Sequence, residues 1–385
     1  MRVNLDAVGG TALHPDAQTA MHEAAARAWA DPRASHAEGR AAAQMLQHAR
    51  EQVAHVLGCQ VQEVSFDTSL SAANRRAVRG LALGRQRVSQ RVVTTAVEHS
   101  SILHACAGLA DGWLAGPGWE QVVLPVDRFG AVDPAAAREL IAQQPISFVA
   151  AQWANSEVGT RQPVSELARD LPASPPVLVD ASAGLGFDDL RTVPWSVLTA
   201  TPTSLGAPSA CAVFAVRDGT RWRAIDTPTD EYEGGRVPGR PDLPAICATA
   251  AAVTAAWAQR EERDQRLRGL TDRLRTEIPS LVRDCVVLGS ADSVCHTVTV
   301  SCLYVSGAAL AAELDAAGFA VGSGSACSSD ALTPSHVLAA MGALTEGNLR
   351  ISLPWNADDS TVDAFLAALP HCVQQVRERF GAPRD

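Results

Sequence analysis

The sequence predicts an α/β fold with a mostly parallel sheet, followed by a smaller α+β region. Between Arg91 and Val216, short β-branched or apolar runs alternate with alanine-rich helical stretches, which is the pattern of parallel strands joined by crossover helices. The connections are rich in Gly, Pro and Asp, as turns between such elements usually are. After about Leu243 the pattern changes, which indicates a second region.

The expected elements follow in chain order. Five runs predict strands of the large sheet: "RVVTTAV" at Arg91, "QVVLPV" at Gln121, "ISFVAAQ" at Ile146, "PVLVDA" at Pro176 and "ACAVFAV" at Ala210. Helical segments are expected between them, for example over 135–144 and 163–171. One long helix is then expected from about Leu243 to about Arg275, followed by strands in "CVVLGS" at Cys285 and "CHTVTVSCLYV" at Cys295 and by further helices.

Composition limits the class of protein. A chain of 385 residues with 47% hydrophobic residues can bury the cores of two domains. Its net charge of −10 carries no basic block, and its arginines are scattered among acidic residues, which argues against nucleic acid as a partner. The start resembles no signal peptide, and the most apolar helical stretch, 245–258, is too short to cross a bilayer. We therefore expect a cytoplasmic protein with no membrane partner.

The cysteines and the basic residues restrict the chemistry. The nine cysteines form no C-x-x-C pair, which argues against a disulfide framework and against a structural metal site. All 32 basic residues are arginines, so the chain contains no lysine. Because a guanidinium stays protonated and offers no free amine to a carbonyl, no side chain here can form a Schiff base.

Six motifs together resemble the cysteine desulfurases of the class V aminotransferase family. They are "VNLDAVGGT" near the start, "VEHSSI" at Val97, "ANSEVGT" at Ala154, "VLVDASAGLG" at Val177, "GSGSACSS" at Gly322 and "LRISL" at Leu349. The resemblance implies a fold type I pyridoxal-phosphate (PLP) transferase-like fold, with a mostly parallel seven-stranded sheet in the large domain and a smaller α+β C-terminal domain. The implied bounds are 15–245 for the large domain, with 1–14 and 246–385 forming the small one. It also implies a homodimer.

The resemblance assigns roles to four residues that are kept. His99 matches the histidine that stacks on the cofactor ring, and Asp180 matches the acid that pairs with the pyridine nitrogen. Asn155 matches a residue at the cofactor's hydroxyl side, and it contacts substrate together with Arg350, which matches the clamp on the substrate carboxylate. Without the resemblance, His99 and Asp180 would be interpreted as helix caps and Arg350 as a surface ion-pair partner.

Other positions of the implied cofactor pocket have changed. Ser204 stands where the family carries its Schiff-base lysine. In the phosphate-binding turn "DTSLSAA", Ser71 keeps a hydroxyl, but Leu70 and Asp67 predict weaker phosphate binding. We therefore expect no covalently held cofactor, and noncovalent binding of PLP is open but disfavoured.

Cys327 lies in a loop rich in Gly and Ser, at the position of the family's nucleophile and persulfide carrier. We expect the loop from Gly322 to Ser329 to be mobile and its thiol exposed, because it has no apolar anchor. By contrast, Cys211 and Cys302 stand among apolar neighbours and are expected to be buried. The alternative is that Cys327 is an idle inherited residue.

Three functional hypotheses remain open. In the first, the chain is a PLP-independent persulfide carrier that acts through Cys327 with a sulfur donor or acceptor protein. In the second, it is a noncatalytic scaffold or regulatory pseudoenzyme that pairs with sulfur-transfer partners. In the third, it is an enzyme that uses PLP or pyridoxamine phosphate noncovalently, which is disfavoured because Ser204 is a poor proton shuttle. If the chain is active, Cys327 and His99 are the expected catalytic residues. The sequence leaves open whether the chain is an enzyme; if it is active, we expect a sulfurtransferase or desulfurase-like transferase.

Overall fold

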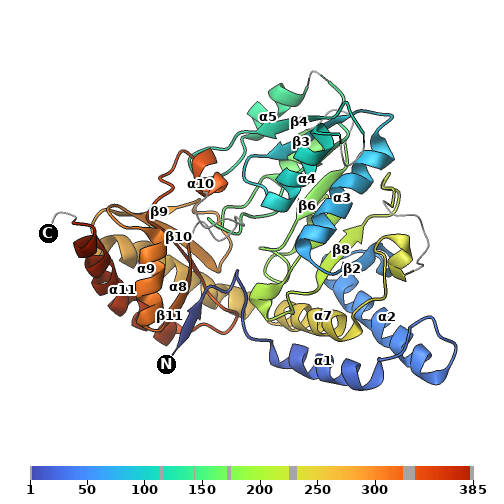
Figure 1. Cartoon of the computed structure of the whole chain (residues 1–385), viewed down its shortest axis with the longest axis horizontal. Helices are drawn as coiled ribbons and strands as arrows, with labels where there is room; N and C mark the ends of the chain where they lie inside the picture. The colour runs from blue at the N-terminus through green and yellow to red at the C-terminus, as the bar shows by residue number, and fades with distance from the viewer. Residues whose placement is uncertain are drawn as a thin grey trace.

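The computed structural model describes residues 2–112, 116–142, 144–170, 175–224, 232–323 and 334–381. They form two lobes, each built around one β-sheet (Figure 1). The first and last described elements both belong to the smaller lobe, so the chain begins and ends there.

The large lobe contains a seven-stranded sheet in the order β2-β8-β7-β6-β5-β3-β4. Its strands are β2 (Val64–Asp67), β3 (Arg91–Thr95), β4 (Glu120–Leu124), β5 (Phe148–Ala150), β6 (Val177–Asp180), β7 (Val197–Ala200) and β8 (Ala212–Val216). The neighbours from β4 to β7 pair in parallel, and only β8 runs against the others. The predicted mostly parallel sheet is therefore confirmed, although β2 and β7 were not recognised as strands in the sequence.

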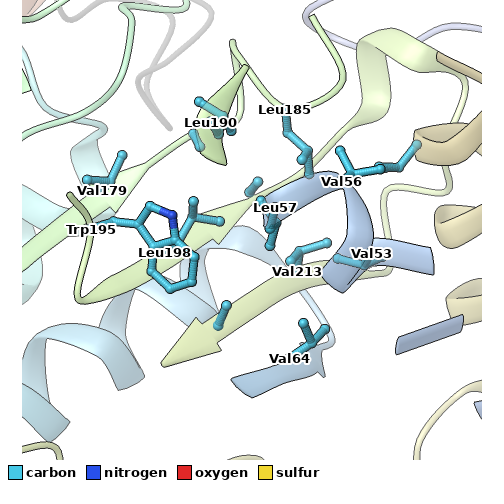
Figure 2. Close-up of a cluster of buried hydrophobic side chains, with 14 of the residues drawn as sticks. Val53, Val56, Leu57, Val64, Val179, Leu185, Leu190, Trp195, Leu198 and Val213 are labelled. Atoms are coloured by element: carbon cyan, nitrogen blue, oxygen red, sulfur yellow. The ribbon is translucent and has the colours of Figure 1, made fainter. Parts of the chain in front are cut away.

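Helices cover both faces of this sheet. One face carries α3 (Leu70–Arg85) and α4 (Ser100–Ala110), and the other carries α2 (Ala37–Leu57), α5 (Pro134–Ile141), α6 (Val164–Asp170) and α7 (Leu243–Ala258). Alternate side chains of each strand serve the two faces, because successive residues point to opposite sides. Figure 2 shows the α2 side, where Val53 and Leu57 pack toward Val179, Leu198 and Val213 of the sheet. Outside this layer, α1 (Pro15–Arg27) lies along α7 (Figure 1).

The small lobe contains a five-stranded sheet in the order β1-β11-β12-β10-β9. Its strands are β1 (Val3–Leu5), β9 (Cys285–Leu288), β10 (Thr297–Cys302), β11 (Phe319–Ser323) and β12 (Asn348–Ser352). Three helices pack on the sheet, namely α8 (Arg260–Leu281), α9 (Gly307–Ala316) and α11 (Asp359–Arg379), while the short α10 (His336–Ala340) lies at the side facing the large lobe (Figure 1). The N-terminal β1 pairs in parallel with β11, which joins the first residues to the C-terminal region.

The single long helix predicted from Leu243 to Arg275 is wrong, because two helices meet at Gln259. This residue has φ −104° and ψ 7°, outside helical geometry. α7 is buried in the large-lobe core as far as Trp257, whereas α8 packs in the small-lobe core. Arg263 of α8 then donates to the carbonyl oxygen of Ala256 at 2.9 Å, which satisfies one of the free carbonyls at the end of α7.

Four short 3₁₀ helices complete the described elements: η1 (Val61–Glu63), η2 (Leu190–Thr192), η3 (Thr203–Leu205) and η4 (Tyr232–Gly235). Across the described ranges, no helix combines the length and the apolar character that crossing a bilayer requires.

Candidate functional site

A cavity of about 1170 Å³ is lined by residues of both lobes. The large lobe contributes the N-termini of α3 and α4 and the segments that follow β6 and β7, which places the cavity at the carboxyl ends of parallel strands. Open α/β sheets bind their ligands at this edge. The small lobe contributes Asp6, His296, Pro334, His336 and Arg350.

Asp180 ends β6 and is held by a buried hydrogen-bond network. One carboxylate oxygen accepts hydrogen bonds from the Ser182 backbone at 3.0 Å and the Ser182 hydroxyl at 2.7 Å, and the other accepts from Asn74 Nδ2 at 3.3 Å. Asn74 also donates to Ser101 Oγ at 3.0 Å and accepts from Thr199 Oγ1 at 2.5 Å. The network fixes a carboxylate just behind the Ser182 wall of the cavity. Asn74, which joins α3, α4, β6 and β7, was not predicted from the sequence.

His99 is both a helix cap and a wall of the cavity. Its Nδ1 accepts a hydrogen bond from the Ser101 backbone N–H at 3.2 Å and lies 2.8 Å from the Ser101 hydroxyl, so His99 caps α4. The imidazole also lines the cavity. Both interpretations of this residue are therefore compatible.

Asn155 does not line the cavity among the described residues, although its neighbour Ser156 does. Its Nδ2 donates to the Val97 carbonyl oxygen at 3.1 Å, and its Oδ1 accepts from the backbone N–H groups of Glu157 and Val158 at 2.9 Å. With 3% of its surface exposed, Asn155 holds the turn that follows β5 in shape. In this structure it supports the site instead of reaching into it.

The N-terminus of α3 is more basic than the sequence suggested. Ser71 lines the cavity, as expected. The expectation that Asp67 adds negative charge there is wrong, because its carboxylate is buried and bound by Arg76 Nε at 2.9 Å, away from the lining. Arg75 lines the cavity instead. A helix N-terminus together with a guanidinium favours an anion.

Ser204 lies in η3, is 4% exposed and lines the cavity. Gly206 closes this turn with φ +77°, and an added Cβ would lie 2.4 Å from the backbone nitrogen of His14, so only glycine fits. The Thr201 backbone N–H donates to Ser182 Oγ at 3.1 Å, and Ser182 in turn binds Asp180. The Ser204 turn is thus tied to the Asp180 network.

Arg350 projects from β12 and is 3% exposed, yet its side chain lines the cavity. It donates to Asp6 Oδ1 at 2.7 Å. Gly322 lies opposite on β11, where an added Cβ would approach the guanidinium to 2.8 Å. The absence of a side chain at Gly322 therefore makes room for Arg350 beside the cavity.

Cys327 and most of its loop lie outside the described residues, so their predicted mobility and exposure stay predictions. The described flanks are informative. Gly322 and Ser323 end β11 next to Arg350, and Pro334 and His336 line the cavity. The segment 324–333 is therefore anchored at the cavity on both sides.

The other eight cysteines are placed differently. None of them lines the cavity in the described part of the chain, and all but Cys59 are buried, including Cys211 and Cys302 as predicted. Burial raises the pKa of Cys59, Cys211 and Cys295 to about 12 and that of Cys247 to about 11. Since the thiolate is the reactive form, these thiols are poor nucleophiles.

The Glu157 carboxylate and the Glu98 backbone connect the large lobe to α10 and the residue before it. Glu157 accepts a hydrogen bond from Ser335 Oγ at 2.8 Å, and His336 Nε2 lies 2.9 Å from the Glu98 carbonyl oxygen. Burial raises the pKa of both Glu98 and Glu157 to about 7. These contacts position the C-terminal flank of the Cys327 segment.

Sequence reasoning missed several cavity residues, of which His296 is the most unusual. Its ring is fully buried, stacks on Phe187 with 4.0 Å between ring centroids, and finds no hydrogen-bond partner for either nitrogen among the described residues. Burial lowers its pKa to about 3, so it is neutral. The only signal in the sequence is a polar residue directly before a strand. Within the described ranges no cluster of three or more potential metal ligands occurs.

Comparison with known proteins identifies the family. The model of the family "Aminotransferase class-V" matches residues 3–191. An IscS-like cysteine desulfurase of Mycobacterium tuberculosis is 31% identical over 392 residues, covering 97% of this chain and 96% of the relative. The chain belongs to the class V aminotransferase family, among its cysteine desulfurase-like members.

Further relatives agree with this membership. Cysteine desulfurase IscS of Methanosarcina thermophila is 29% identical over 335 residues, which covers 86% of this chain and 81% of the relative. Among solved structures, one named "NIFS-LIKE PROTEIN" superimposes with a TM-score of 0.88 at 24% identity, covering 97% of this chain and 100% of that one. The desulfurase-like chain therefore has the predicted fold type I architecture.

Proposed function

We propose that this desulfurase-like chain acts in sulfur transfer as a PLP-independent persulfide carrier through Cys327. One observation carries the proposal. The described residues on both sides of the Cys327 segment lie at the cavity or next to its residue Arg350, and none of the eight described cysteines lines the cavity. The thiol is thereby tethered to a cavity that Arg75 of the large lobe and Arg350 of the small lobe both line.

The tether is short enough to bring the thiol to the cavity. Cys327 follows Ser323 by four residues, and an extended residue spans about 3.3–3.6 Å, so the tether from the end of β11 reaches about 14 Å at most. Arg75 and Arg350 both line the cavity. A neighbouring guanidinium favours a thiolate over a thiol, and the thiolate is the form that accepts sulfur.

The residues present do not fit a covalently held PLP. Such a cofactor is held by a lysine Schiff base, and this chain has no lysine. By the order of the family motifs, Ser204 occupies the lysine position, and its hydroxyl cannot form a Schiff base. His99 and the Asp180 network would still suit a pyridine ring, so noncovalent PLP binding is the alternative that a test must address.

The transfer chemistry needs no cofactor. The Cys327 thiolate attacks the outer sulfur of a donor persulfide, a new S–S bond forms at Cys327, and the donor's S–S bond breaks with the donor thiolate leaving. Delivery to an acceptor thiolate is the same exchange in reverse. The partners we infer are therefore a persulfide-bearing sulfur donor and a thiol acceptor.

We also infer that the chain is a homodimer, as expected for the family. Obligate interfaces bury more than about 2,000 Å² in total, so the dimer should persist at micromolar concentration. Sedimentation of a stable monomer at that concentration would contradict this inference.

Persulfide loading tests the proposed function. Cofactor-free protein is incubated with glutathione persulfide, and intact mass and peptide mapping locate any added sulfur. We expect one sulfur atom on Cys327, none on Cys327→Ser, and unchanged loading of Cys59→Ser, which removes the one described cysteine that is not buried. A scaffold would take up no sulfur, and loading that survives in Cys327→Ser would assign the reaction to another thiol.

A further inference from the structure

A pair of neighbouring thiols lies in the small lobe, away from the cavity lining. Cys285 begins the edge strand β9 and faces Cys302, which ends β10. The neighbouring Leu303 backbone N–H donates to the Asp284 carbonyl oxygen at 2.9 Å, so the cysteines occupy the adjacent non-hydrogen-bonded pair of this antiparallel ladder. Their sulfur atoms are 2.6 Å apart.

This position has the geometry that a disulfide requires. In a non-hydrogen-bonded antiparallel pair the Cα atoms are about 4.5 Å apart, within the range of about 4.4–6.8 Å found across disulfides. The two side chains also point to the same face of the sheet, because directly opposed residues do so. Forming the S–S bond would therefore require little movement of the backbone.

A buried arginine adds the charge that this chemistry needs. Arg377 of α11 donates to the Arg283 carbonyl oxygen at 2.6 Å and to the Leu303 carbonyl oxygen at 3.3 Å, so its guanidinium spans both strands next to the sulfur atoms. A hydrogen bond from Cys285, together with the charge of Arg377, holds the pKa of Cys302 below its usual value despite burial. Cys302 is thus the thiol that ionises first and attacks.

We propose that Cys285 and Cys302 form a modification site at which a small peroxide oxidises the two thiols to a cross-strand disulfide. The Cys302 thiolate attacks one peroxide oxygen, the O–O bond breaks, and a sulfenic acid and hydroxide form, the latter becoming water on protonation. The Cys285 sulfur then attacks the sulfenic sulfur, the S–S bond forms, the S–O bond breaks and a second water leaves. Two thiols are oxidised by two electrons, and one hydrogen peroxide is reduced to two waters.

Burial of the two cysteines favours a small oxidant, and the resulting disulfide would restrain the hairpin that carries it. Cys285 is 6% exposed and Cys302 is 2% exposed, so a small peroxide gains access more readily than a bulky disulfide. The bond would close the segment 285–302, which contains the cavity residue His296. Oxidation would thereby limit opening of the hairpin that carries this wall of the cavity.

Thiol counting and peptide mapping test the proposed disulfide by a readout that does not depend on the cavity or on Cys327. Reduced full-length protein in a Cys327→Ser background is treated with hydrogen peroxide, quenched, denatured and alkylated. The eight remaining thiols should fall to six, with one cross-linked peptide pair joining Cys285 to Cys302. Cys285→Ser and Cys302→Ser should lose the cross-link, and Cys372→Ser, which removes another buried cysteine of the same lobe, should keep it.

Either of two results in the thiol count and the peptide map would overturn the proposal. If the Cys327→Ser chain, with Cys285 and Cys302 intact, keeps all eight of its thiols after peroxide treatment, or if its cross-link joins other cysteines, the site does not exist. This readout uses the wild-type sequence at both positions, so it holds even where a serine variant fails to fold. Because Cys327 is absent from the background, the outcome is independent of the proposed persulfide function.

Discussion

The two walls of the cavity differ in how their polar groups are satisfied. On the large-lobe wall, Asp180 is bound by Asn74 and Ser182 within the chain itself. On the small-lobe wall, His296 is fully buried with no partner on either nitrogen among the described residues. The Asp180 carboxylate on the large-lobe wall is therefore held in place by the chain's own hydrogen bonds. The imidazole of His296, by contrast, gains no such support from the described residues.

Removing Asn74 from the large-lobe wall should cause the largest loss of stability. Asn74→Ala leaves the Thr199 hydroxyl and one Asp180 oxygen without a buried partner, so we expect a loss of about 2–4 kcal/mol in the free energy of unfolding. Urea unfolding at pH 7 measures it. Ser71→Ala, at the cavity surface of the same helix, should lose less than about 0.5 kcal/mol. Equal losses in the two variants would show that the buried Asn74 network does not stabilise the large-lobe wall more than a cavity-surface hydroxyl does.

On the small-lobe wall, the buried His296 should make the free energy of unfolding depend on pH under acidic conditions. His296 has a pKa lowered to about 3 in the folded chain, against about 6.5 when unfolded. Below pH 6.5 the unfolded chain binds more protons, so stability falls toward pH 3 with a contribution of up to about 1.4 kcal/mol per pH unit. His296→Asn should flatten this slope, and His22→Asn, at an exposed site, should not. An unchanged slope in His296→Asn would contradict the buried, neutral imidazole.

Glu98 should give a smaller effect of opposite sign in the large lobe. Its pKa is raised to about 7 when folded, against 4.5 in the unfolded chain, so its contribution to stability is full below pH 4.5 and is lost as pH rises through 7. Glu98→Gln removes this loss, so its free energy of unfolding should rise relative to wild type by about 2–3 kcal/mol between pH 5 and pH 8. Exposed Glu261→Gln serves as the control in the same urea series. A parallel pH profile in Glu98→Gln and wild type would show that Glu98 is ionised throughout.

The sequence predicted the architecture better than it predicted the site. Five apolar runs located the large sheet because strands covered by helices on both faces read as continuous apolar segments. The strands β2 and β7 were missed because a polar residue, Ser65 or Thr199, interrupts each apolar run; their length is not the reason, since β6 is as short and β5 is shorter. The motifs located His99, Ser204 and Arg350 at the cavity, but the partner that neutralises Asp67 and the network through Asn74 depend on contacts between distant segments. Local patterns carry no information on such pairings.

The most direct test of the central claim, that this chain carries sulfur without a Schiff-base cofactor, compares two sulfur sources on one protein. Purified protein with and without added PLP is given either cysteine or glutathione persulfide, and alanine and Cys327 persulfide are both quantified. The account predicts no alanine from cysteine under either condition, and Cys327 loading from the persulfide alone, at the same level with and without PLP. Alanine produced from cysteine in the presence of PLP would contradict it, because the chain would then be a desulfurase that binds its cofactor noncovalently.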